Sequence, residues 1–266
     1  MAQSTKKKQF KTLTTLNERF FIMTLLTNDF LKKHGFDANE IQIFNNICAD
    51  GEESLNVLHK LADWPDWENF ESLKYEEVIL RAKHLDFAQS LVSVLPFEDT
   101  PLVQDNVLNE NLIWLGDAHV KGNIYTDKII FVKGQLKVDG KINVYGRGQI
   151  YTCGKNLIAD AIYLRHRAHI CTDHNKNTKI QSDTLSMMEN AIIDTNINSN
   201  IIHIINGNIN GDITAKEIKA ISGRLVGNIS ANSLGNYRAY LNGKINVDYI
   251  YPLTEDCLES VKIWLE

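Results

Sequence analysis

The densest group of chemically active side chains is the segment Arg165-His-Arg-Ala-His-Ile-Cys-Thr-Asp-His174. Imidazole and thiolate groups are zinc ligands, so His169, Cys171 and His174 form a candidate metal site. Their spacing matches no common zinc motif, and we expect neither a metal nor a cofactor. Arg165, Arg167 and His169 are alternatively a basic docking patch for a protein partner. The interpretation that we favour over both is a solvated excursion from the main fold.

Three aspartates, Asp160, Asp183 and Asp194, are candidates for general acid–base chemistry on a polysaccharide. Such chemistry needs carboxylates that converge on one face, with a basic group such as Arg165 near them. The repeat described below allows these residues to stack on one face of the fold. Its short coils leave little room for a substrate groove, so we expect a non-enzymatic protein. A carbohydrate-active lyase or hydrolase is the alternative.

Residues 40–99 carry 13 acidic and only 4 basic side chains. An acidic surface steers basic partners, and tryptophan is a common interface anchor. Trp64, Trp67, Glu68 and Glu71 are therefore candidate docking residues for a basic protein such as a nuclease toxin, which would make the chain an immunity protein. The simpler interpretation is a solvated helical face with both tryptophans in the core.

Composition narrows the functional classes. The 266 residues carry a formal net charge of −5, and no basic stripe exists beyond the first dozen positions, which argues against nucleic acid binding. Four scattered cysteines without a CxxC pair indicate reduced thiols and a cytoplasmic location. The apolar run at residues 20–26 is too short for a membrane span. No phosphate loop or nucleophile motif is present.

A repeat of 16 residues between Ile193 and Ile250 predicts the structural elements that must position these side chains. An octad of the form Gly-x-Ile-x-x-x-x-(Ile/Leu) starts at Gly211, Gly227 and Gly243. Aligned residues recur at the same step in four columns: Ile197, Ile213, Ile229, Ile245; Ile193, Ile209, Leu225, Leu241; Ile202, Ile218, Leu234, Ile250; and Ser199, Ala215, Ala231, Val247. Apolar columns at a fixed period are typical of a solenoid.

Alternation within each octad predicts strands. Ile213 and Ala215 flank a polar residue, and Gly and Asn crowd the corners. We therefore predict an α+β, mainly β chain built on a right-handed parallel β-helix, with three short strands and roughly 16–18 residues per coil. Earlier coils are predicted at Leu108–Ile113, Ile124–Ile129, Ile142–Val144, Leu157–Ile162 and Ile180–Leu185. Asn residues between 190 and 236 are interpreted as corners and amide ladders rather than a ligand-binding face.

Prolines mark two domain boundaries. Residues 1–100 are predicted to form an α-helical domain, 101–251 the β-helix, and 252–266 a short amphipathic helix. The N-terminal helices are predicted at about 15–35, 37–50, 54–61 and 70–95. We expect these helices to cover the first coil and the C-terminal helix to cover the last, because an uncovered coil exposes strand edges.

The repeat resembles that of bactofilins, the polymer-forming bacterial cytoskeletal proteins. The residues that carry the resemblance are Asn208–Ile218 and Ser222–Ala231, and the pattern Gly-x-(apolar)-x-Gly-x-Ile-x-Ala is matched well over 205–250 and loosely over 116–145. The resemblance implies a right-handed β-helix that is not an enzyme and that acts as a scaffold through protein–protein contacts, with itself or with another protein. Bactofilins leave their coil ends free, whereas both ends are predicted to be covered here, so the oligomeric state stays open.

Overall fold

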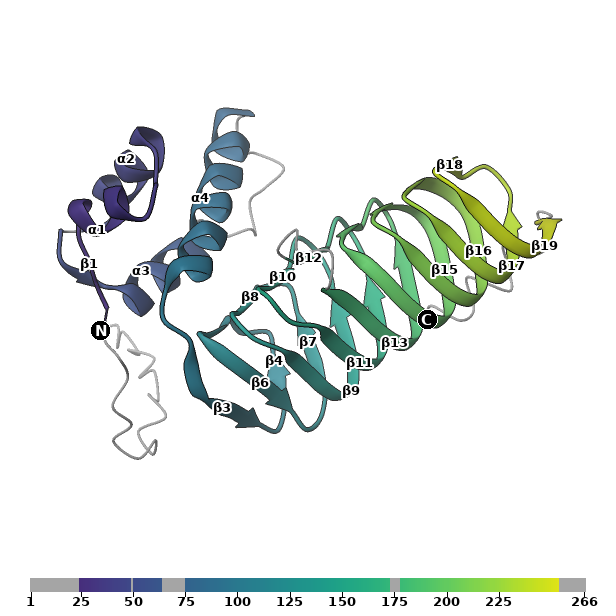
Figure 1. Cartoon of the computed structure of the whole chain (residues 1–266), viewed down its shortest axis with the longest axis horizontal. Helices are drawn as coiled ribbons and strands as arrows, with labels where there is room; N and C mark the ends of the chain where they lie inside the picture. The colour runs from purple at the N-terminus through teal and green to yellow at the C-terminus, as the bar shows by residue number, and fades with distance from the viewer. Residues whose placement is uncertain (1–23, 49, 64–74, 173–177, 254–266) are drawn as a thin grey trace, which may run out of the picture.

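The computed structural model describes residues 24–48, 50–63, 75–172 and 178–253, and within them a set of helices precedes a long parallel β-solenoid (Figure 1). The helices are α1 (Asn28–Lys33), α2 (Ala38–Ile47), α3 (Ser54–Ala62) and α4 (Tyr75–Val94). The short strands β1 (Leu25–Leu26) and β2 (Glu52–Glu53) pair antiparallel beside them. The solenoid strands are β3 (Glu98–Gln104), β4 (Val107–Leu108), β5 (Leu112–Trp114), β6 (Gly116–Val120), β7 (Ile124–Thr126), β8 (Ile129–Val132), β9 (Leu136–Val144), β10 (Gln149–Thr152), β11 (Leu157–Leu164), β12 (His169–Thr172), β13 (Lys179–Met188), β14 (Ile192–Asp194), β15 (Asn196–Asn210), β16 (Ile213–Val226), β17 (Ile229–Asn236), β18 (Tyr240–Asn242) and β19 (Ile245–Pro252).

The solenoid strands form nine coils, and every pairing between coils is parallel, which confirms the predicted parallel β-helix. The coils are β3-β4-β5, β6-β7-β8, β9-β10, β11-β12, β13-β14, β15, β16, β17-β18 and β19. Strand pairing begins at Glu98, shortly before the expected boundary at residue 101. Each coil has three faces, here called the first, second and third in chain order.

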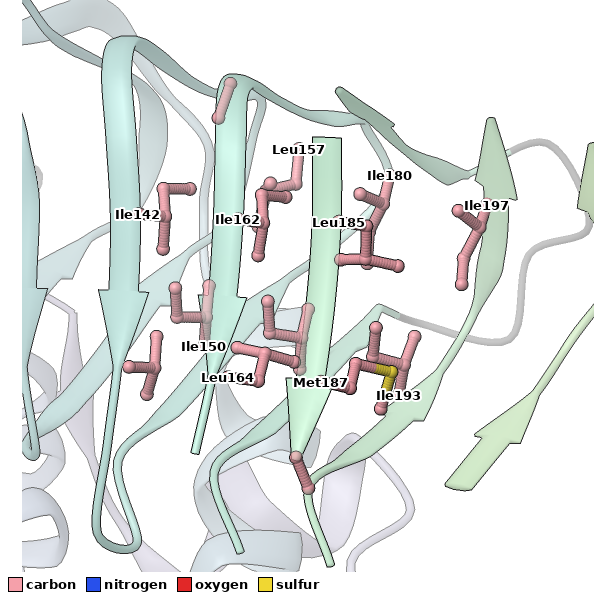
Figure 2. Close-up of a cluster of buried hydrophobic side chains, with 14 of the residues drawn as sticks. Ile142, Ile150, Leu157, Ile162, Leu164, Ile180, Leu185, Met187, Ile193 and Ile197 are labelled. Atoms are coloured by element: carbon pink, nitrogen blue, oxygen red, sulfur yellow. The ribbon is translucent and has the colours of Figure 1, made fainter. Parts of the chain in front are cut away.

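Inward-facing residues form columns along each face, in which each residue pairs with one in the next coil; one column of each face is as follows. The first column is Leu102, Ala118, Leu136, Leu157, Ile180, Ile197, Ile213, Ile229 and Ile245. The second is Val107, Ile124, Ile142, Ile162, Leu185, Ile202, Ile218, Leu234 and Ile250. The third is Leu112, Ile130, Ile150, Ile170, Ile193, Ile209, Leu225 and Leu241. Figure 2 shows members of all three columns meeting inside the middle coils, where they form a continuous apolar core.

The upstream coils correct the sequence prediction in register. Leu108 is 65% exposed, and the inward residue at that position is its neighbour Val107. The step along the first column is 16 residues from Ile197 onward, but it rises to 23 between Leu157 and Ile180 (180 − 157). Coils are present at the predicted places Leu108–Ile113 and Ile124–Ile129, but Leu108, Ile113 and Ile129 do not face the interior: Leu108 is exposed, and Ile113 and Ile129 pack against the helices.

The helices cover a side of the solenoid that includes the first coil. Outward-facing residues of the third face pack in one buried cluster with α3 and α4: Ile113, Ile129, Phe131, Tyr151, Cys153 and Cys171 from the strands, with Leu58, Leu61, Phe87, Leu91 and Leu95 from the helices. In Figure 1 the rod extends away from this helical unit. Strand β8 is accordingly buried at every position, as expected of a strand covered on both sides.

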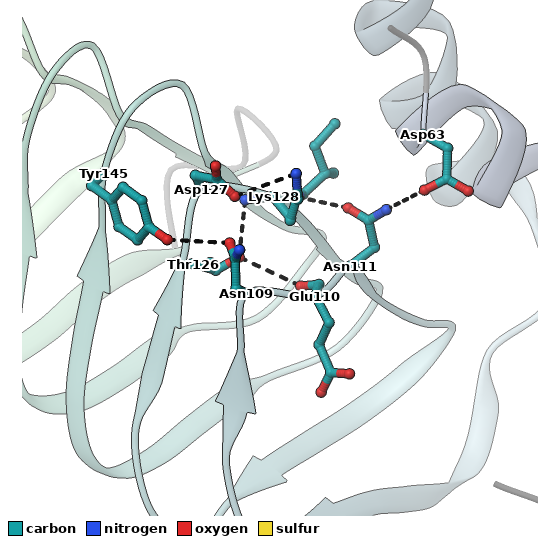
Figure 3. A network of polar contacts seen from close by, with 9 residues as sticks. Asp63, Asn109, Glu110, Asn111, Thr126, Asp127, Lys128 and Tyr145 are labelled. Atoms are coloured by element: carbon teal, nitrogen blue, oxygen red, sulfur yellow. Dashed lines mark hydrogen bonds and ion pairs between the residues drawn. The ribbon is translucent and has the colours of Figure 1, made fainter. Parts of the chain in front are cut away.

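Polar contacts attach the helical unit to the early coils. The Lys133 ammonium donates to the carbonyl oxygens of Val92 (3.0 Å), Ser93 (2.7 Å) and Leu95 at the end of α4. A cation at this place satisfies carbonyls that lack a partner within the helix. Asn111 donates through its amide to Asp63 at the end of α3 and accepts from the backbone of Ile129 in β8 (Figure 3).

The helical part confirms some sequence predictions and corrects one. Helix α2 begins at the predicted capping box, in which the Asp37 carboxylate accepts from the backbone of Glu40 and the Glu40 carboxylate accepts from the backbone of Asp37. The helix predicted at 15–35 is wrong where it is described: Leu25 and Leu26 form strand β1, and α1 begins only at Asn28. The predicted helix at 252–266 lies outside the described residues, apart from its first two positions.

A ladder of side-chain oxygens confirms the predicted role of Asn at the corner between the third and first faces. The side-chain oxygen of Asn196 accepts from the backbone of Asp212, Asp212 does the same for Asn228, and Asn228 for Lys244. A glycine directly precedes Asp212, Asn228 and Lys244, because the backbones of neighbouring coils approach closely there. A Cβ at Gly227 would lie 2.2 Å from the carbonyl oxygen of the preceding coil.

Candidate functional site

The basic residues predicted as a docking patch lie on a turn between the second and third faces. Residues 165–168 form this turn, in which the Ala168 amide donates to the Arg165 carbonyl at 3.1 Å. Its central residues His166 and Arg167 have φ of 52° and 69°, a left-handed conformation that costs side chains other than Gly about 1–2 kcal/mol each. His166 contacts the Glu189 carboxylate on the next turn, with which it forms an ion pair when protonated. The side chain of Arg167 is exposed, and that of Arg165 is half-buried.

Arg147 belongs to the same patch, although the sequence analysis missed it. It lies on the equivalent turn of the preceding coil, because Gln149 pairs with His169 two residues further along. Burial, followed by the charge of Arg167, lowers the pKa of Arg147 to about 10. The signal in the sequence is an arginine two residues before a strand of the third face: Arg147 precedes β10 and Arg167 precedes β12.

His169 separates from the two arginines because its side chain lies on the outer side of the third face, near α4. Its Nε2 atom lies 2.8 Å from the Asp194 carboxylate, with which it forms an ion pair when protonated. Burial raises the pKa of Asp86 on α4, and the charge of His169 opposes that shift. His169 therefore forms part of the contact region between solenoid and helices.

The candidate zinc residues do not form a site in the described part of the chain. Cys171 is buried in strand β12, where its sulfur accepts from the Gln89 amide at 3.4 Å, so it is not in a solvated excursion. Burial raises the pKa of Cys171 to about 12, which favours the neutral thiol over the thiolate that binds metals. His174 lies outside the described residues. Among those that are described, no group of three His, Cys, Asp or Glu residues could hold a metal ion.

The three aspartates proposed for polysaccharide chemistry are not brought together. Asp160 and Asp183 line a shallow groove of about 570 Å³ on the first face. Asp194 lies on the third face, bonded to His169. Arg165 is on another corner. The predicted convergence on one face is therefore wrong for this trio.

Two further groove residues were missed by the sequence analysis. Asp139 lines the groove one coil before Asp160, and hydrogen bonds from Lys137 and then His119 lower its pKa. Asn200 donates to the Asp183 carboxylate at 2.8 Å. The neighbours of Asp139 and Asp183 thus engage these carboxylates in hydrogen bonds along the face. Such an arrangement stabilises the stacking of coils.

The end of the last coil was also missed and carries the clearest exposed apolar surface. Ile245 is 39% and Ile250 is 59% exposed, whereas Ile229 and Leu234 in the same columns one coil earlier are 1% and 0% exposed. The signal in the sequence is the termination of the columns at Ile250, just before Pro252. Trp64, Trp67, Glu68 and Glu71, the candidates for binding a basic protein, lie outside the described residues.

None of the helices within the described ranges combines the length and apolar character needed to cross a membrane. Comparison of the chain with protein-family models, with curated proteins and with solved structures finds no match.

Proposed function

We propose that this chain is a non-catalytic protein-binding β-solenoid that works as a scaffold, and that its main contact surface is the end of coil nine. The observation that carries the proposal is the exposure of Ile245 and Ile250, two members of columns that otherwise form the core. An exposed apolar surface beside an unpaired strand edge is typical of a protein contact site.

Two other observations support a binding role over a catalytic one. Asp194 lies on a different face from Asp160 and Asp183, and burial raises the pKa of the Cys171 thiol. The similarity of residues 205–250 to the bactofilin repeat favours the same class, because bactofilins are assembly proteins and not enzymes. The exposed turn at Arg167 offers a second, smaller contact surface on the side of the rod.

A comparison of variants tests the proposal. The full chain would be immobilised through its N-terminus and incubated with lysate from its native source, and the retained proteins would be identified by mass spectrometry. We expect Ile250→Asp to lose proteins that the wild type retains, the chain itself included. Leu108→Asp is the matched control, because Leu108 is as exposed as Ile250 but lies in coil one. Identical sets of proteins for wild type and Ile250→Asp would contradict the proposal.

A further inference from the structure

The last coil presents to solvent the side chains that face the core in earlier coils. Strand β19 pairs with β17 along one edge, and in the part of the chain that the structure describes no strand pairs with its other edge. Figure 1 shows β19 at the far end of the rod from the helices. A bare strand edge with apolar residues next to it is a surface that proteins normally cover.

The chain leaves coil nine along its side rather than across its end. Leu253 is only 4% exposed and packs with Ile221 of coil seven. The partly buried side chains around this pair come from the outer side of the second face and its neighbouring turns: Tyr163, Met188, Ile205, Tyr237 and Tyr251. The first residue after the last strand therefore packs on the side of the solenoid, against coil seven.

The opposite end of the solenoid differs from this one. Val107, the first member of the column that ends at Ile250, is fully buried, and Leu112 is also buried. End-to-tail stacking into a filament needs two complementary open ends, whereas a two-fold contact uses the same surface on both copies. The ladder of side-chain oxygens also stops at the last coil, because its position there is Lys244, which has no acceptor for a further parallel coil.

From these observations, and on the basis of the proposed function, we infer that a second copy of this chain covers the end of coil nine, tail to tail about a two-fold axis. The two β19 strands then run antiparallel, and Ile245 and Ile250 of each copy are buried against the other. Lys244 and Asp248 give this end side chains of both signs, so a copy of itself is not repelled. The assembly is a closed dimer, because a two-fold contact uses the same end of both copies.

The test is the mass of the purified full-length protein, measured by sedimentation equilibrium across a wide range of concentrations. We expect the wild type to approach twice the chain mass of 30.2 kDa. Ile250→Asp should raise the dissociation constant by about tenfold or more, because a charge replaces a central apolar contact. Leu108→Asp, at the opposite end, should dimerise as the wild type does. Circular dichroism verifies that both variants are folded, and Tyr249→Ala provides a second, milder change at the same end.

Each other outcome overturns the inference. A wild-type mass of 30.2 kDa at every concentration rules out the dimer. Masses that continue to grow with concentration indicate a filament instead. Loss of the dimer in Leu108→Asp places the contact at the wrong end. If the purified wild type is monomeric while Ile250→Asp still loses a heterologous partner from lysate, the proposed function stands and only the second copy is excluded.

Discussion

The second column offers a comparison of one substitution at two positions that differ only in burial. Ile218→Ala removes about three carbon atoms from a fully buried side chain that pairs with Ile202 and Leu234. At ~0.8 kcal/mol per buried CH₂ group, the lost transfer free energy is about 2.4 kcal/mol. The cavity left in the narrow core adds ~1–2 kcal/mol, because the ladders above and below prevent the coil from collapsing. We expect the free energy of unfolding to fall by about 3.5–4.5 kcal/mol.

Ile250→Ala is the matched control for this change. Its side chain is already 59% exposed, so the same substitution should cost about 1 kcal/mol and leave no cavity. Urea unfolding followed by far-ultraviolet circular dichroism measures both losses, at a protein concentration too low for association to contribute. Equal losses at the two positions, or a loss below about 1 kcal/mol at Ile218, would refute the assignment of this column to the core.

Two further predictions concern a buried imidazole and a close backbone contact. Burial, and then the charge of Lys219, lower the pKa of His203 from its ordinary value of 6.5, so the folded state favours the neutral ring. The contribution of His203 to stability is complete above pH 6.5 and is lost as the pH falls below that value toward the folded-state pKa. The melting temperature of His203→Gln should therefore fall less on acidification than that of the wild type. An equal fall in both proteins would contradict this prediction. Gly227→Ala should lower the free energy of unfolding by more than ~3 kcal/mol, because the added Cβ would collide with the backbone of the preceding coil. Gly154 also has a positive φ but has open space around it, so Gly154→Ala is the control and should cost ~1 kcal/mol in the same urea assay.

The sequence was sufficient for the architecture where the coil length is constant. From Ile197 to Ile245 each inward position recurs after 16 residues, so the columns and their inward orientation could be read directly. The capping box at Asp37 was equally local, because its two hydrogen bonds join residues three apart. Both predictions depended on patterns that no distant contact altered.

The prediction failed where a second apolar environment lies outside the solenoid. Ile129 and Ile130 are both buried, but Ile130 faces the interior and Ile129 faces the helices. An apolar pattern alone does not tell these two kinds of burial apart, so Ile124–Ile129 matched the five-residue step by coincidence. The prediction of a helix at Leu25–Leu26 failed for a similar reason. Leu26 is buried, but strand β1 forms because it pairs with Glu52, which is distant in sequence.

The attachment of the helices to one face and the exposed apolar residues of the last coil together determine what the proposed scaffold could do. Lys133 and Asn111 attach α4 and α3 to the early coils, so the helical unit moves with that end of the rod. Nine coils at about 4.8 Å make a rod of roughly 43 Å. Two copies joined at coil nine would therefore make a rod of about 80–90 Å, and this length would set the separation of the helical units that pack against coils one to four of each copy. Since each coil packs against its neighbours through an unbroken core, that separation would be set by the number of coils rather than by a flexible linker.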